Sequence, residues 1–133
     1  MTNEIKNEFI SRILTVTGED KAKFGQMNVS QMICHCADQL RMAFGEIRGL
    51  RRQEVDIVKL REMAIKNEPL PAVACLDQIA GEGTRPTELE KDKAILIAYL
   101  NRFIETDANY KYSFHPYYGE IDKTDGKNWS FII

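Results

Sequence analysis

Residues 28–47 constrain the fold of this chain more than any other stretch. Their apolar residues recur at steps of three and four, the spacing that gathers side chains on one face of an α-helix. That face consists of Val29, Met32, Ile33, Cys36, Leu40, Ala43, Phe44 and Ile47. Asn28 stands at the N-cap position, and Gln31 completes a capping-box pair with it. The pattern predicts a core helix that begins at Asn28 and ends at about Ile47 or Gly49.

The remaining segments predict further helices and no clear strand, so we expect an all-α fold. Pairing of Thr87 with Glu90 indicates a capping box at the start of a helix. The seven consecutive apolar residues 94–100 indicate that this helix is covered on more than one side. We expect helices over 2–15 and 87–106, one or two short helices within a long connection at 50–86 that includes the turn residues 81–86, and the start of a fourth main helix at Thr124 or Asp125. Residues 1–133 then form one helical bundle domain.

Composition excludes several classes of function. The chain has 133 residues and a formal net charge of −2, without a basic stripe, which argues against binding to nucleic acid or to an anionic membrane surface. No apolar run approaches the ~20 residues of a membrane span, and the N-terminal residues lack the apolar core of a signal peptide. We therefore expect a cytoplasmic protein, in which Cys34, Cys36 and Cys75 are reduced and serve as small apolar side chains.

The tripeptide Cys34-His35-Cys36 looks like a metal-binding cluster, but its geometry on a helix argues against one. Residues two apart on a helix are rotated by ~200°, so the two cysteines point to nearly opposite sides. His35 lies at the flank of the apolar face. Its ring could point into a bundle cavity, with Gln39 or a backbone carbonyl orienting the second nitrogen, or it could form an ordinary hydrogen bond at the rim.

The other candidate residues are one histidine and two carboxylates. His115 precedes Pro116 and has two interpretations. It is either a packed turn residue or a second histidine that approaches His35 at the end of the bundle. Asp38 points away from the apolar face and is a poor candidate for a metal ligand, whereas Glu46 stays open as one. No paired carboxylates or Ser-His-Asp arrangement suggests hydrolytic chemistry.

Three segments together resemble the DinB-like superfamily, which includes metalloenzymes: GQMNVSQMICHCAD at 25–38, PTEL at 86–89, and HPYYG at 115–119 ahead of Trp129. The resemblance implies a four-helix bundle with a long connection between its second and third helices. It also implies a divalent metal, such as Zn²⁺ or Ni²⁺, bound by one histidine of the second helix and two of the fourth. His35 occupies the second-helix position. The fourth-helix histidines have no counterpart before Ile133, so we expect either a longer protein or a truncated fourth helix.

Several functions fit these features. By resemblance, the protein is a divalent-metal-dependent transferase, hydrolase or isomerase that acts on a small molecule, with a low-molecular-weight thiol as a candidate co-substrate. If the chain ended at Ile133, its three long helices would leave an apolar groove, and a homodimer or helix-binding module would follow. A metal-free bundle that binds an apolar ligand is the third alternative.

Overall fold

The computed structural model describes residues 2–23, 25–49, 56–66, 68, 76–107 and 109–113. In order, the helices are α1 (Asn3–Thr15), α2 (Val29–Ala43), α3 (Ile57–Ile65) and α4 (Leu89–Glu105). No strand occurs among these residues, so the all-α expectation is confirmed for this part of the chain. The helix expected from Thr124 or Asp125 and the turn around His115 lie outside the described residues.

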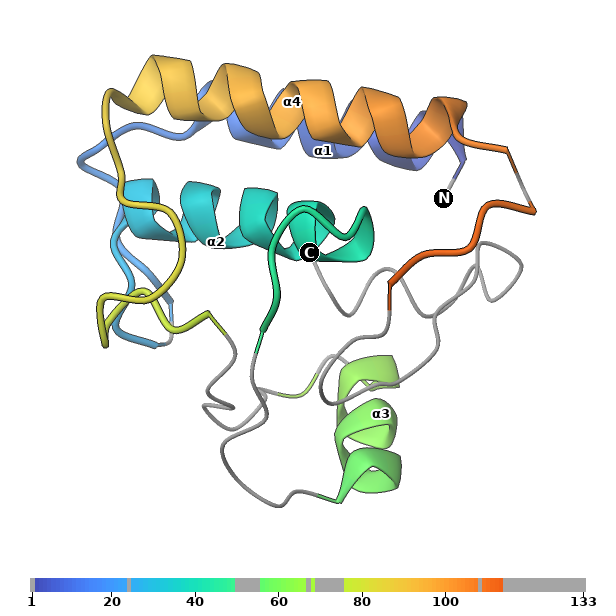
Figure 1. Ribbon diagram of the computed structural model, residues 1–133. Coiled ribbons are helices and arrows are strands. Elements are labelled where there is room, and N and C mark those ends of the chain that lie inside the picture. The colour runs from blue at the N-terminus through green and yellow to red at the C-terminus, as the bar shows by residue number, and fades with distance from the viewer. Residues whose placement is uncertain are drawn as a thin grey trace.

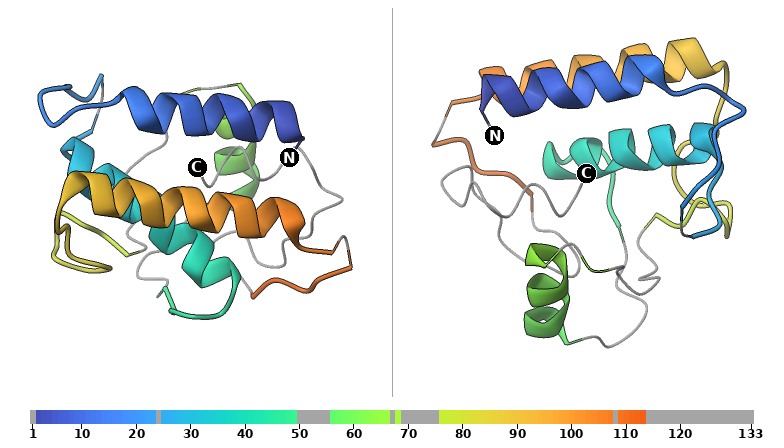
Figure 2. Two further views of the ribbon diagram at one scale, coloured as in Figure 1. Left: turned by 90° about the horizontal axis from the view of Figure 1, so that it is seen from above. Right: turned by 180° about the vertical axis from the view of Figure 1, so that it is seen from behind.

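Three of the helices pack together (Figures 1 and 2). α1 and α4 lie side by side in opposite directions, and α2 lies beneath α4 and runs the same way as α4. α3 stands apart from these three helices. The main core lies among α1, α2 and α4 and consists of Ile13, Val29, Ile33, Cys36, Ala37, Leu40, Ala43, Leu96, Leu100, Phe103 and Tyr112. Most of the α2 face predicted from its periodicity therefore packs into the core or against it.

The predicted start of α2 is confirmed, but the helix ends earlier than predicted. The Asn28 side chain accepts from the Gln31 amide at 2.9 Å, and the Gln31 side chain accepts from the Asn28 amide at 3.0 Å. At the other end Gly45 adopts a left-handed φ of 76°. Its amide donates to Met42 and the Glu46 amide donates to Arg41, which is the Schellman pattern of helix termination. The helix therefore stops at Ala43.

The capping box predicted at Thr87 is wrong, because a different interaction uses its side chain. The Thr87 amide and hydroxyl both donate to the Asp92 carboxylate, each at 2.9 Å. α4 begins two residues later, at Leu89, with Glu88 as an N-cap that makes no side-chain hydrogen bond. These hydrogen bonds with Asp92 hold the segment before α4 against the first turns of the helix.

The expectation that α4 is covered on more than one side is confirmed, because α4 packs against both α1 and α2, but a further side of the helix is exposed. Leu96 and Leu100 are almost completely buried, at 1% and 0% exposure, and pack toward α2. Ala94 and Ala98 are exposed, and Ile95 is 39% exposed. The continuous apolar run therefore contains one buried stripe and one exposed side.

A buried lysine connects α4 to the end of α1. The ammonium of Lys93 donates to the carbonyl of Val16 at 2.6 Å and to that of Leu14 at 3.5 Å, and pairs with Glu90 at 3.1 Å. Carbonyls at a helix C-terminus have no partner within the helix and carry partial negative charge. Lys93 satisfies them and holds the two helices together.

Candidate functional site

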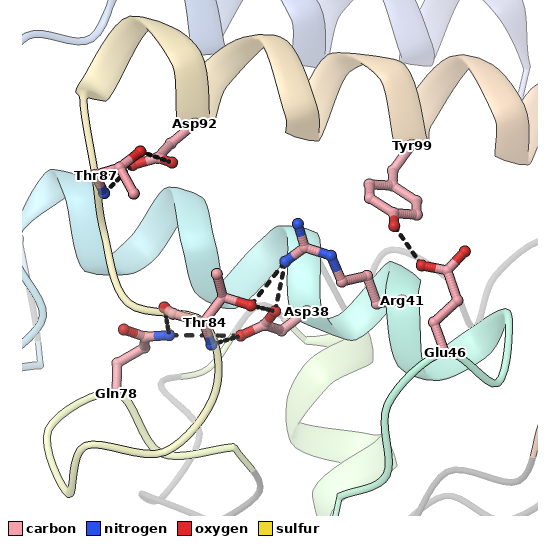
Figure 3. A network of polar contacts seen from close by, with 8 residues as sticks. All are labelled: Asp38, Arg41, Glu46, Gln78, Thr84, Thr87, Asp92 and Tyr99. Atoms are coloured by element: carbon pink, nitrogen blue, oxygen red, sulfur yellow. Dashed lines mark hydrogen bonds and ion pairs between the residues drawn. The ribbon is translucent and has the colours of Figure 1, made fainter.

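Among the described residues, the most extensive polar network centres on Asp38 of α2, whose exposure is 0% (Figure 3). One carboxylate oxygen accepts from the Thr84 hydroxyl at 2.7 Å and from the Arg41 guanidinium at 2.8 Å. The other accepts from the Thr84 amide at 2.7 Å and, more weakly, from the Gln78 side chain at 3.5 Å. A charge can be buried at such a site because these donors replace its water.

Through these hydrogen bonds, Asp38 connects the middle of α2 to a loop that is distant in the sequence. We define residues 76–84 as the docked loop. The Gln78 side chain also donates to the Thr84 carbonyl at 2.9 Å, and the Arg41 guanidinium donates to the Thr84 hydroxyl at 2.9 Å. Asp38 was correctly placed away from the core face, but this loop covers it. Its role as an anchor was missed because helical periodicity carries no information about a partner 46 residues away.

Gly83 permits this close approach. Its φ is 73°, and a Cβ atom at this position would lie 2.4 Å from the nearer Asp38 oxygen. Gly81, in the same loop, has a φ of 79° but nothing within 4 Å of the corresponding position. Any side chain at residue 83 would therefore collide with the anchor, whereas one at residue 81 would meet only conformational strain.

The docked loop is also braced internally. The Asp77 side chain accepts from the amides of Ile79 and Ala80, at 2.9 and 3.3 Å. The Glu82 amide donates to the Asp77 carbonyl at 2.8 Å, and the Glu82 side chain accepts from the Asp77 amide at 3.1 Å. These bonds close a compact turn that begins directly after Leu76.

Leu76 has a backbone conformation that is unusual for a leucine. Its φ is 55°, and no other non-glycine residue in the described part of the chain has a positive φ. A Cβ in this left-handed region crowds the neighbouring carbonyl and costs about 1–2 kcal/mol. The braced loop that follows supplies the contacts that hold this strained residue in place.

His35, the histidine singled out from the sequence, lies on α2 about one turn before Asp38. Burial lowers its pKa, and a hydrogen bond to the backbone of Leu76 and the charges of Asp38 and Asp77 oppose that effect in part. The net direction favours a neutral imidazole, which is the form that binds metals. The Nδ1 atom is buried and has no hydrogen-bond partner among the described residues. Which group orients the ring, Gln39 or a backbone carbonyl, stays a prediction.

The cysteines beside His35 have separate surroundings, as the helical geometry predicted. Cys36 packs into the core, and its thiol lies 3.8 Å from the Met32 sulfur. Burial raises the pKa of Cys36 to about 12. Burial, with the negative charges of Asp92 and Asp38, raises that of Cys34 to about 11. Both are therefore protonated thiols at neutral pH, unsuited to nucleophilic chemistry.

Glu46, the carboxylate kept open as a ligand, lies beyond the end of α2. It accepts a hydrogen bond from the Tyr99 hydroxyl and pairs with Arg102 at 2.6 Å. Those two contacts lower the pKa of Glu46. On the same surface, the Arg102 guanidinium stacks on the Phe44 ring, 3.8 Å from its centre. Glu46 thus joins α2 to α4 and does not come together with His35.

The described residues contain no group of three or more His, Cys, Asp or Glu side chains that could hold a metal ion. His35 is therefore a single candidate ligand in this part of the chain, and His115 lies outside it. Within the same ranges, no helix is both long enough and apolar enough to span a membrane.

Comparisons with protein-family models, curated proteins and solved structures found no match to this chain. The DinB-like resemblance accordingly rests on the sequence segments alone.

Proposed function

We propose that this protein is a divalent-metal-dependent enzyme of the DinB-like type that acts on a small molecule, and that His35 supplies one metal ligand. The observation that carries the proposal is the state of the His35 ring. Its Nδ1 atom is buried without a hydrogen-bond partner among the described residues, and its lowered pKa favours a free lone pair. An unpartnered polar atom in a protein interior is costly unless it serves a purpose, and metal binding is such a purpose.

The surroundings of His35 are compatible with its imidazole as a metal ligand. They exclude the nearest carboxylate on α2 as a second ligand. Asp38 lies one turn further along α2, yet both of its oxygens already accept hydrogen bonds from Thr84. The proposal therefore takes the other ligands from outside the described residues. A bound Zn²⁺ or Ni²⁺ would supply Lewis acidity and would activate water or a low-molecular-weight thiol. The contribution of His35 is to hold the ion and orient it.

The exposed apolar side chains of α1 do not support the alternative of a non-catalytic binding or homodimer module. Two large exposed apolar side chains lie on α1, Ile5 at 44% and Leu14 at 60% exposure. They are nine residues apart, and at ~100° per residue they point to opposite sides of the helix. They therefore do not make one continuous stripe of the kind that a partner helix would cover.

Metal analysis of the purified protein tests the proposal. We expect about one divalent ion per chain in the wild type and loss of most of it in His35→Ala, with Cys34→Ala as a neighbouring control that retains the metal. Equal metal content in wild type and His35→Ala would remove His35 from the site. Absence of metal from the wild type, even after incubation with Zn²⁺ or Ni²⁺, would refute the proposal.

A further inference from the structure

Polar contacts hold the docked loop on α2. Asp38 accepts hydrogen bonds from the amide and hydroxyl of Thr84, both at 2.7 Å, and from the side chain of Gln78 at 3.5 Å. No side chain of residues 76–84, all of which are described, belongs to the main core or to the apolar residues packed against it, and Ile79 is 48% exposed. A segment held by hydrogen bonds with little apolar burial opens at a lower free energy than the core.

Arg41 closes a triangle of hydrogen bonds where the loop meets α2. Its Nη1 atom donates to Asp38 at 2.8 Å and to the Thr84 hydroxyl at 2.9 Å. That hydroxyl donates to the same Asp38 oxygen at 2.7 Å. The Arg41 side chain is only 17% exposed. Because each of the three residues is positioned by the other two, the orientation of the guanidinium depends on the docked loop.

The same guanidinium lies over an aromatic ring of α4. Its central carbon is 5.2 Å from the centre of the Tyr99 ring, which is within the range of a cation–π contact. The Tyr99 hydroxyl donates to Glu46, which pairs with Arg102 at 2.6 Å, so the far end of the ring is also held. Figure 3 shows Arg41 between Thr84 on one side and Tyr99 on the other. One side chain therefore contacts both the docked loop and α4.

We propose that the Arg41–Tyr99 contact couples docking of the loop to the junction of α2 and α4. When Thr84 leaves Asp38, Arg41 loses one of the two groups that orient it, and its contact with the Tyr99 ring weakens. Because coupling between two sites is reciprocal, loss of the ring favours undocking of the loop to the same extent. The junction thereby sets how often the buried Asp38 carboxylate meets solvent. This coupling is independent of metal binding and of the proposed function.

Two substitutions at residue 99 form a matched test. Tyr99→Phe removes the hydroxyl and its hydrogen bond to Glu46 but keeps a ring for Arg41, whereas Tyr99→Leu removes the ring as well. The readout is hydrogen exchange of the Thr84 amide, measured by NMR, because that amide donates to Asp38 only while the loop is docked. The amide of Leu40, a core residue of α2 with 0% exposure, reports opening of the core in the same spectra.

We expect Tyr99→Leu to accelerate exchange at Thr84 about threefold or more relative to exchange at Leu40, which is the scale of a partly desolvated cation–π contact. Tyr99→Phe should leave this ratio unchanged. In Arg41→Met protein, which lacks the guanidinium, Tyr99→Leu should cause no further change. An unchanged ratio in Tyr99→Leu would overturn the proposal. So would an equal effect of the two substitutions, or an acceleration that persists in Arg41→Met protein.

If Arg41→Met does not fold, because Asp38 then lacks its ion pair, the reciprocal measurement decides. Thr84→Val removes the hydroxyl that Arg41 contacts and should shift the ring-proton signals of Tyr99. Thr87→Val is the control, since that threonine contacts a different carboxylate, and it should leave the Tyr99 signals in place. Tyr99 signals that do not move in folded Thr84→Val protein, or that move equally in Thr87→Val, would overturn the proposal.

Discussion

Substitution of Asp38 by asparagine tests the importance of the buried anchor. Asparagine keeps the shape but retains only one accepting oxygen, so the Thr84 amide or hydroxyl loses its acceptor. An unsatisfied buried donor costs about 1–3 kcal/mol. The contact with Arg41, 2.8 Å in the native protein, also loses its charge. The pair is partly buried, so we expect a total loss of about 3 kcal/mol in the free energy of unfolding at pH 7.

Urea denaturation followed by circular dichroism measures this loss, and Asp92→Asn serves as the control. Asp92 also accepts from a threonine amide and hydroxyl, each at 2.9 Å, but forms no ion pair among the described residues. We expect it to lose about 1 kcal/mol. A domain of this size is stable by about 5–15 kcal/mol, so the difference is measurable. If Asp38→Asn costs no more than Asp92→Asn, the reasoning about the anchor is refuted.

Three further predictions concern the core, the helix-joining ion pair and the thiols. Leu100→Ala, at a position with 0% exposure, should lose about 2–5 kcal/mol of unfolding free energy in the same urea assay, and a loss below 1 kcal/mol would contradict its place in the core. Because Tyr99 and Arg102 lower the pKa of Glu46, its contribution to stability is present at neutral pH and is lost as pH falls through the depressed folded-state value. Wild type should exceed Glu46→Gln in stability at pH 7, and the difference should close toward pH 3; a constant difference would contradict this. In Cys75→Ser protein, the two remaining thiols should react with a disulfide reagent at pH 8 about a hundredfold or more slowly than in urea, and rapid labelling of the folded form would refute their burial.

The helices could be predicted from the sequence where local signals determine them. The Asn28 capping box and the periodic apolar face identified α2, because both depend on residues within one or two turns. The end of α2 was placed too late, since Phe44 and Ile47 continue the apolar period while Gly45 ends the helix through backbone geometry. At Thr87 a capping pattern was present, but the Asp92 carboxylate competed for the same donors.

The candidate site could be predicted only in part. His35 was chosen as a candidate from its flank position and from the resemblance, and its role as a metal ligand stays a prediction. The Asp38 anchor was missed because its partners in the docked loop lie 40 and 46 residues away, in a connection without periodicity. Gly83 carried a signal that could be read as a turn, but its contact with Asp38 depends on how the loop docks.

The central claim is that His35 binds a divalent metal, and a Zn²⁺ titration of protein labelled with nitrogen-15 histidine tests it most directly. We expect the Nδ1 signal of His35 to shift to a metal-bound position, saturating at about one equivalent, and the shift to be absent with Mg²⁺, which prefers oxygen ligands. A His35 spectrum that remains unchanged up to a large excess of Zn²⁺ would contradict the claim.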